Sequence, residues 1–247
     1  MQHDLKQETM SISKHIPNAI TCCNLLSGCI SIMFITYYKN PVMAAVMIFA
    51  AAVFDFLDGF AARALHAKSP IGADLDSLSD VVSFGVAPSF IIAWHLKASG
   101  LHCNMMHLDI IPCLAFFIAV FAAIRLAKFN NDTRQASSFI GLPVPATGLF
   151  IASLPLMMSA TGSDNVLADV VLNPYFLLFS SAILCWLMIS EVPFFSFKMK
   201  NISFKDNVLR YIVVIFALLS VAFFKIAALP FIFIFYILLS VIFYRGE

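Results

Sequence analysis

The fold is decided by residues 41–80, which read PVMAAVMIFAAAVFDFLDGFAARALHAKSPIGADLDSLSD. A long apolar run leads into a short polar turn at 66–70, and a second helix-forming segment starts after it. An ionised aspartate at the centre of a bilayer costs about 2.5–3.5 kcal/mol on insertion scales. The acids of this stretch therefore need a compensating partner. They are Asp55, Asp58, Asp74, Asp76 and Asp80.

The whole chain has the composition of a polytopic membrane protein. Of its 247 residues, 61% are hydrophobic and 12% are charged, and the mean hydropathy is +0.92. A helix needs about 20 apolar residues to cross the hydrocarbon of a bilayer. The sequence predicts an all-α integral membrane fold, a bundle of about eight transmembrane helices. The apolar runs lie at 17–38, 41–63, 72–96, 109–129, 142–160, 172–190, 209–224 and 227–244.

The connections between these runs are short, which predicts a single transmembrane domain over residues 17–247. Residues 1–16 are expected to form a cytoplasmic juxtamembrane segment, either an amphipathic stretch on the membrane surface or a frayed terminus. This segment is long and acidic at Asp4 and Glu8, so we do not expect the first apolar run to be a cleaved signal peptide.

Basic residues indicate the orientation in the membrane. Nearly all Lys and Arg fall in the N-terminal segment, in the regions 63–71, 125–141 and 191–210, and at the C-terminus. The positive-inside rule makes these regions and both termini cytoplasmic, and the acidic stretch then opens toward the cytoplasm. The net charge of +1 and the lack of a basic run with interleaved aromatics give no support for nucleic-acid binding.

The acids of the 41–80 stretch are spaced to share helix faces. Residues three or four apart lie on one side of a helix. Because the turn is short, the two helices must be antiparallel neighbours, and we expect four acids to converge on one pocket. Asp74 points away from it, toward solvent or lipid headgroups. One face carries Asp55, Asp58, Gly59 and Ala62, and the other carries Gly72, Asp76 and Asp80.

Four converging carboxylates favour a metal site. Arg63 alone cannot neutralise them, whereas one or two divalent ions with oxygen ligands can, and Mg²⁺ or Mn²⁺ fits such a site. The small residues on the same faces leave room for a ligand, and Arg63 can contact a phosphate. The sequence therefore predicts a phosphorylated substrate. Two alternatives stay open: pairing with basic residues elsewhere in the bundle, and a cation-coupled transporter whose pathway the acids would mark.

The complete motif resembles the signature of the CDP-alcohol phosphotransferase family. The resemblance implies a helical membrane enzyme, usually a homodimer, that transfers a phosphatidyl group from a CDP-linked lipid to an alcohol and releases CMP. It covers about residues 15–150. The motif is Asp55-x2-Asp58-Gly59-x2-Ala62-Arg63-x8-Gly72-x3-Asp76-x3-Asp80.

The resemblance also implies roles for the residues of the motif. Asp55, Asp58, Asp76 and Asp80 would hold two divalent metal ions, Mg²⁺ or Mn²⁺, and Asp80 would also act as the general base. Gly59, Ala62 and Gly72 would make room for the cytidine, and Arg63 would lie near the diphosphate. The residues predicted to bind the CDP-lipid are Asp58, Gly59, Ala62, Arg63 and Gly72, with Asn18 and Thr21 added below.

Polar residues recur every third position in the first helix, at Asn18, Thr21 and Asn24. We expect them to contact the nucleotide. The alternative is ordinary hydrogen bonding between helices.

The flanks of the motif narrow the acceptor. They are similar to family members that use serine, whereas members that act on glycerol 3-phosphate typically have Pro where this chain has Ser77. The resemblance therefore implies transfer from CDP-diacylglycerol to L-serine, giving phosphatidylserine and CMP, in a bacterial-type inner membrane. The flanking segments are PNAITCCNLLSG at 17–28, DSLSDVVSFGVAPS at 76–89, RLAKFN at 125–130 and FIGLPVPA at 139–146.

Serine carries a carboxylate and an ammonium, so its pocket should contain a cation and hydrogen-bond acceptors. The candidates are Ser83, Arg125, Lys128 and Asn130. For Arg125 and Lys128 the alternative is a routine positive-inside anchor. Glycerol 3-phosphate or inositol remains open as the acceptor, because a phosphorylated acceptor would suit the basic residues Arg134, Lys198, Lys200 and Lys205.

Overall fold

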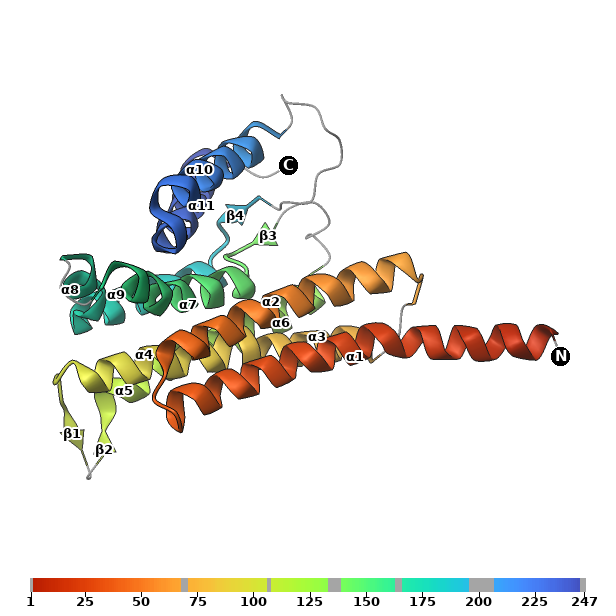
Figure 1. Cartoon of the computed structure of the whole chain (residues 1–247), viewed down its shortest axis with the longest axis horizontal. Coiled ribbons are helices and arrows are strands. Elements are labelled where there is room, and N and C mark those ends of the chain that lie inside the picture. Colours follow the sequence, from red (N-terminus) through yellow and green to blue (C-terminus); the bar gives the residue numbers. More distant parts are fainter. Residues whose placement is uncertain are drawn as a thin grey trace.

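A computed structural model describes residues 2–67, 71–105, 108–132, 139–162, 166–195 and 207–244. The architecture is a bundle of helices with two very short strand pairs (Figure 1). The predicted all-helical membrane fold is confirmed. The α-helices are α1 (Gln2–Thr36), α2 (Pro41–Ala64), α3 (Gly72–Asp80), α4 (Ala87–Ala98), α5 (Ile110–Cys113), α6 (Phe117–Asn131), α7 (Val144–Thr161), α8 (Val166–Leu172), α9 (Pro174–Ile189), α10 (Val208–Phe224) and α11 (Leu229–Phe243).

Within the described residues, six helices are long and apolar enough to cross a membrane, or seven if the bent pair α8 and α9 is one span. This count treats residues 208–243 as one span. The chain nevertheless turns at Lys225, whose φ is 52°. There α10 ends, and α11 packs back against it, with Phe216 stacked on Phe235 at a centroid distance of 4.1 Å. The predicted total of eight spans stays a prediction.

The first two helices form an antiparallel hairpin (Figure 1). The side chain of Asn40 caps α2 by accepting a hydrogen bond from the Met43 amide at 3.0 Å, and Pro41 follows as a first helical residue that needs no donor. Between the helices, Ser31 Oγ donates to the carbonyl of Ala44 at 2.8 Å. At its other end, α1 continues straight to Gln2, so residues 2–14 extend the helix beyond the bundle.

The central span runs from Gly72 to Ala98 through α3, a π-helical turn at Val81–Val86, and α4. Of its apolar window, 61% is buried, against 33% for the span in α1. Small residues of the neighbouring helices allow this close packing. A Cβ at Gly28 would lie 2.6 Å from Ser83 Oγ, and one at Gly148 would lie 2.8 Å from Phe84 Cα. Backbone therefore meets backbone around the π-helical turn, directly after Asp80.

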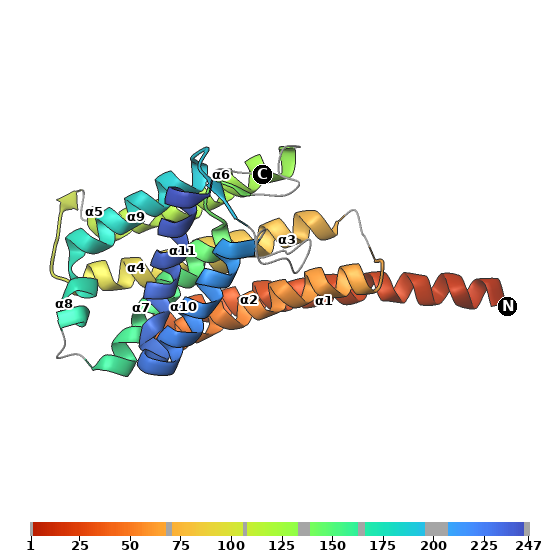
Figure 2. The same ribbon diagram turned by 90° about the horizontal axis from the view of Figure 1, so that it is seen from above.

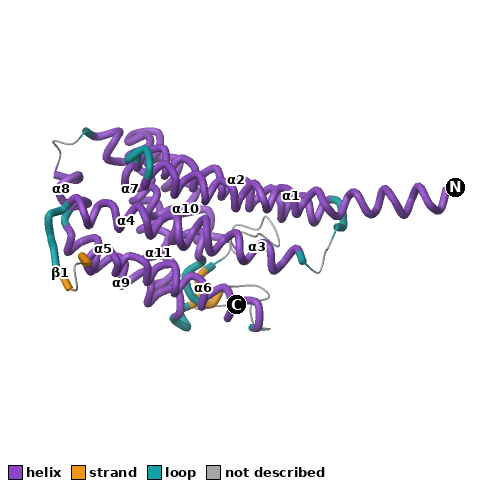
Figure 3. The backbone as a smooth tube through the Cα atoms, turned by 90° about the horizontal axis from the view of Figure 1, so that it is seen from below, coloured by secondary structure: helices purple, strands orange, loops and turns teal. Residues whose placement is uncertain are grey.

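The two strand pairs lie apart from each other (Figure 3). One joins β1 (Asn104–Met105) to β2 (Leu108–Asp109). It is closed by Asp109, whose carboxylate lies 2.6 Å from His102 Nδ1, and this hydrogen bond holds the pKa of Asp109 below its usual value. The other pair joins β3 (Phe139–Ile140) to β4 (Pro193–Phe194).

The second strand pair positions the last helices. It links the chain before α7 to the chain after α9, and Leu142 N donates to the carbonyl of Leu187 at 2.9 Å. Figure 2 shows α10 and α11 lying across α7, and α11 contacts both α7 and β4. The C-terminal helices thus pack on the side of the bundle that β4 reaches.

Candidate active site

Three acids meet at the junction of α2 and α3. One carboxylate oxygen from each of Asp55, Asp76 and Asp80 lies within 4.8 Å of the others. Asp55 comes from α2 and the other two from α3, as the short connection between these helices predicts. Asp80 is only 6% exposed. Among the described residues, this is the one group of three or more acidic, His or Cys side chains close enough to share a metal ion.

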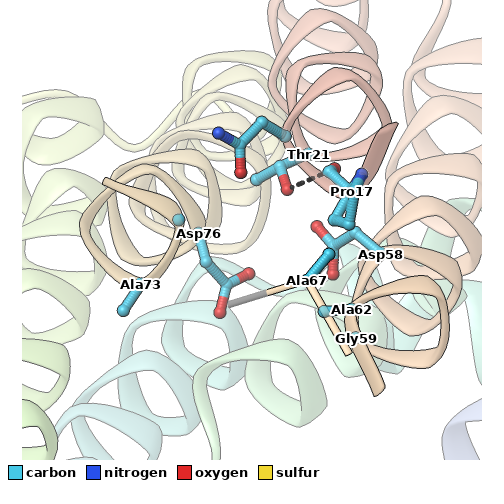
Figure 4. A pocket seen from close by; sticks show the side chains of 10 residues that line it. Pro17, Thr21, Asp58, Gly59, Ala62, Ala67, Ala73 and Asp76 are labelled. Carbon is cyan, nitrogen blue, oxygen red and sulfur yellow. Dashed lines mark hydrogen bonds between the residues drawn. The ribbon is translucent and has the colours of Figure 1, made fainter. Parts of the chain in front are cut away.

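Asp58 lies outside that group and lines a neighbouring cavity of about 330 Å³. In Figure 4, Asp58 and Asp76 point into this cavity from opposite sides, so Asp76 belongs to both the acidic group and the cavity. The four predicted acids therefore surround two adjoining places. The other lining residues are Pro17, Asn18, Thr21, Gly59, Ala62, Ala67, Gly72 and Ala73.

The small residues of the motif form one wall of the cavity. Gly59, Ala62 and Gly72 all line it, in agreement with their predicted role of leaving space. The exposed Arg63 folds back over this wall, because a Cβ added to Gly59 would lie 3.3 Å from its Nη1 atom. A guanidinium thus stands at the rim of the space that the glycines open.

Helix α1 forms the opposite wall. Asn18 and Thr21 line the cavity, and Thr21 Oγ1 donates to the carbonyl of Pro17 at 3.0 Å (Figure 4). Asn24, on the same face, instead donates from Nδ2 to Oδ1 of Asp80 at 3.2 Å. The three-residue spacing therefore predicts which face of α1 meets the site. It does not indicate the lining residues Pro17, Ala67 and Ala73, which carry no polar side chain.

The predicted acceptor residues do not form one group. Arg125 is buried, 5% exposed, and its guanidinium interacts electrostatically with Asp80. Lys128 and Asn130 are exposed, and Asn130 Nδ2 donates to Ser77 Oγ at 2.9 Å. Ser83 is fully buried and donates to the Asn24 carbonyl at 3.0 Å, so its hydroxyl serves helix packing. The basic residues Arg134, Lys198, Lys200 and Lys205 lie outside the described residues.

Two further predictions concern the surroundings of the site. Asp74 is exposed on α3, as expected for contact with solvent or headgroups. Arg125 is not a surface anchor at the helix end, because the protein buries it beside the acids.

The acidic group fits a divalent cation. Carboxylate oxygens are the ligands that Mg²⁺ and Mn²⁺ prefer. Among the described residues, Oδ1 of Asp76 and Oδ2 of Asp58 are buried and have no hydrogen-bond partner. A buried charged oxygen without a partner is costly, and a coordinated cation removes that cost.

Fold and site together define a helical integral membrane protein with an acidic site beside a cavity between its first three helices. The sequence model of the CDP-alcohol phosphatidyltransferase family matches residues 14–195, which include every residue of that site. The chain therefore belongs to this family, and it is a phosphatidyltransferase.

Curated relatives carry one name, CDP-diacylglycerol–serine O-phosphatidyltransferase. The protein of that name from Bacillus subtilis is 31% identical over 188 residues, which is 74% of this chain and 92% of the relative. One from Helicobacter pylori is 35% identical over 143 residues, and the match spans 57% of each chain. One from Methanocaldococcus jannaschii is 30% identical over 156 residues, 63% of this chain and 68% of the relative. No solved structure matches the chain.

Proposed function

We propose that the protein transfers the phosphatidyl group of CDP-diacylglycerol to L-serine, giving phosphatidylserine and CMP. The observation that carries this proposal is the acidic group of Asp55, Asp76 and Asp80 beside a cavity walled by small residues. The names of the relatives support serine as the acceptor. The cavity volume of about 330 Å³ falls in the range of small-molecule sites.

The cavity would hold the cytidine end of the donor. Gly59, Ala62 and Gly72 leave the space, and Asn18 and Thr21 offer polar contacts from α1. Arg63, which lies beside Gly59, would contact the diphosphate at the rim. The two acyl chains would then extend into the lipid that surrounds the helices.

Asp55, Asp58, Asp76 and Asp80 would hold two divalent ions, Mg²⁺ or Mn²⁺. Bound there, such ions would supply Lewis-acid stabilisation of the charge on the diphosphate and on the departing CMP. The partnerless oxygens of Asp58 and Asp76 support this assignment.

In the reaction, the serine hydroxyl oxygen forms a bond to the phosphorus that carries diacylglycerol. The bond from that phosphorus to the CMP oxygen breaks, and CMP leaves with the electron pair. Asp80 accepts the proton of the hydroxyl as general base. The hydrogen bond from Asn24 fixes one oxygen of Asp80, so the other is directed to the acceptor.

Arg125 would bind the carboxylate of serine, because it is a buried cation close to Asp80. Lys128 and Asn130 would act at the exposed entrance, and Ser83 would act through its contact with Asn24. This places the serine carboxylate on the α6 side of the general base.

We further propose that residues 17–247 form one catalytic domain of eight spans, with residues 1–16 as a cytoplasmic juxtamembrane segment. Both termini and the site would face the cytoplasm of a bacterial-type inner membrane, and the protein would be a homodimer. The basic residues near the site, Arg63 and Lys128, support this orientation.

The test is acceptor-dependent release of CMP from CDP-diacylglycerol by the purified full-length protein in detergent with Mn²⁺ or Mg²⁺. Serine, glycerol 3-phosphate and inositol are supplied separately. Release with serine alone supports the proposal. Release with one of the other alcohols would replace serine as the acceptor, and release with none of them by folded protein would contradict the proposed reaction.

A further inference from the structure

Helix α11 lies beyond the family match at 14–195 and still buries a phenol in the interior of the protein. Tyr236 is 6% exposed. Its hydroxyl donates to the carbonyl of Phe195 at 3.1 Å, and its ring meets the ring of Phe195 edge-on at a centroid distance of 5.1 Å. These contacts hold the phenol oxygen in one place.

Arg125 connects this phenol to the acidic site. Its guanidinium interacts electrostatically with the carboxyl of Asp80 and with the phenol of Tyr236. It also lies 4.9 Å from the ring centroid of Phe129, which holds it from α6 itself. All three polar groups, Asp80, Arg125 and Tyr236, are at most 6% exposed. A buried polar sequence therefore runs from the proposed general base to α11.

A second phenol of the same region lacks a partner. The hydroxyl of Tyr244 is buried and has no hydrogen bond among the described residues. It interacts electrostatically with Tyr236, and its ring lies 5.9 Å from that of Phe195. An unsatisfied buried hydroxyl is costly, so a polar ligand near Tyr236 would remove this cost.

We propose that Tyr236 is a positioning residue that helps to select the acceptor, by fixing the Arg125 guanidinium beside Asp80. This inference rests on the proposed function. A guanidinium binds a carboxylate through two parallel N–H donors only when its plane is correctly oriented. The rigidly held phenol and the Phe129 ring set that plane from two sides, so Arg125 meets the carboxylate of an amino-acid acceptor.

The proposal divides the labour of the site. The donor cavity is built from residues of α1, α2 and α3, within the family match. The acceptor side receives Tyr236 from outside that match. The C-terminal hairpin of α10 and α11 thereby contributes to the choice of acceptor and leaves donor binding to the first helices.

The experiment compares full-length protein with its Tyr236→Phe variant, which keeps both ring contacts and loses only the hydroxyl. CMP release is measured against the concentration of L-serine, of serinamide, which lacks the carboxylate, and of CDP-diacylglycerol. We expect the KM for serine to rise about tenfold, the energy of one hydrogen bond to a charged group. The preference for serine over serinamide should fall by a similar factor, and the KM for CDP-diacylglycerol should not change.

Two further variants sharpen the result. Tyr175→Phe, at an exposed position of α9, should behave as the unmodified protein. In Arg125→Lys the acceptor preference should already be lost, so adding Tyr236→Phe should cost little more. Additive effects of the two changes would contradict the coupling.

The outcomes also separate the two proposals. If the unmodified protein releases no CMP with serine, the proposed function fails and this inference fails with it. If serine works and Tyr236→Phe keeps the serine to serinamide preference, only the role of Tyr236 is overturned. An equal loss of serine and CDP-diacylglycerol use would also overturn it, because Tyr236 would then only support the fold.

Discussion

Asn24 of α1 donates a hydrogen bond to Oδ1 of Asp80 in α3 at 3.2 Å, and both residues are buried. This contact joins the first helix to the acidic site. The Asn24 carbonyl in turn accepts a hydrogen bond from Ser83 at 3.0 Å, in the π-helical turn that follows Asp80. The orientation of the proposed general base is therefore fixed from outside its own helix.

Replacing Asn24 by Leu should remove that orientation. We expect kcat to fall about 10- to 100-fold, since a hydrogen bond to a charged group contributes roughly 1.5–3 kcal/mol, while the KM for CDP-diacylglycerol stays nearly constant. Steady-state CMP release measures both. Thr36→Val, an exposed change at the far end of α1, serves as the control. An unchanged kcat in Asn24→Leu would show that Asp80 needs no support from α1.

Asp80→Asn should retain binding of CDP-diacylglycerol and lose turnover. Removing a general base typically costs about 10²- to 10⁴-fold in rate. The exposed Asp74→Asn, on the same helix, makes the same chemical change and should keep normal activity. Equilibrium binding of the donor and single-turnover CMP release separate the two effects, and normal turnover in Asp80→Asn would rule out its role as base.

Asp76→Asn should weaken binding of Mn²⁺, because Asp76 contributes to the acidic group and also lines the cavity. Second-shell or ligand changes cost about 10- to 100-fold in metal affinity. Electron paramagnetic resonance of added Mn²⁺ counts the bound ions without relying on activity. Asp169→Asn, an exposed change in α8, is the matched control. Equal Mn²⁺ affinity in Asp76→Asn and in the unmodified protein would remove Asp76 from the metal site.

Gly28→Ala should destabilise the bundle. The added Cβ would lie 2.8 Å from Cα of Ser83, a backbone atom that cannot move without shifting the helix. Overpacking of this kind costs about 1–3 kcal/mol. At Gly59, by contrast, the nearest atom to an added Cβ is the flexible end of Arg63 at 3.3 Å, so Gly59→Ala should unfold at nearly the normal temperature. Thermal unfolding in detergent that shows equal midpoints for both variants would contradict the tight contact at Gly28.

Helical spacing predicts the carboxylate face, and the structure refines it. Residues three apart on an α-helix differ by about 60° around its axis. Asp55 therefore reaches Asp76 and Asp80, while Asp58 enters the cavity. Spacing alone could not assign the two acids to these places, because the packing of α2 against α1 and α3 decides which direction each one takes.

Other features of the site depend on contacts between distant parts of the chain. The sequence places Arg125 at a helix end, where an exposed anchor and a buried ligand give the same pattern. Its burial comes from the surrounding fold, and the Tyr236 phenol with which it interacts is brought in by α11. No periodicity predicts the hydrogen bond from Tyr236 to Phe195. The break at Lys225, in contrast, lies where the apolar runs 209–224 and 227–244 predict it.

The central claim is that the acidic group and its cavity transfer a phosphatidyl group to serine. The most direct measurement supplies isotope-labelled serine with CDP-diacylglycerol and Mn²⁺, and follows both the label in extracted lipid and the CMP released. We predict equal amounts of labelled phosphatidylserine and CMP from the unmodified protein, and neither from Asp76→Asn. Label that stays in the aqueous phase while CMP is released, or full lipid labelling by the variant, would contradict the account.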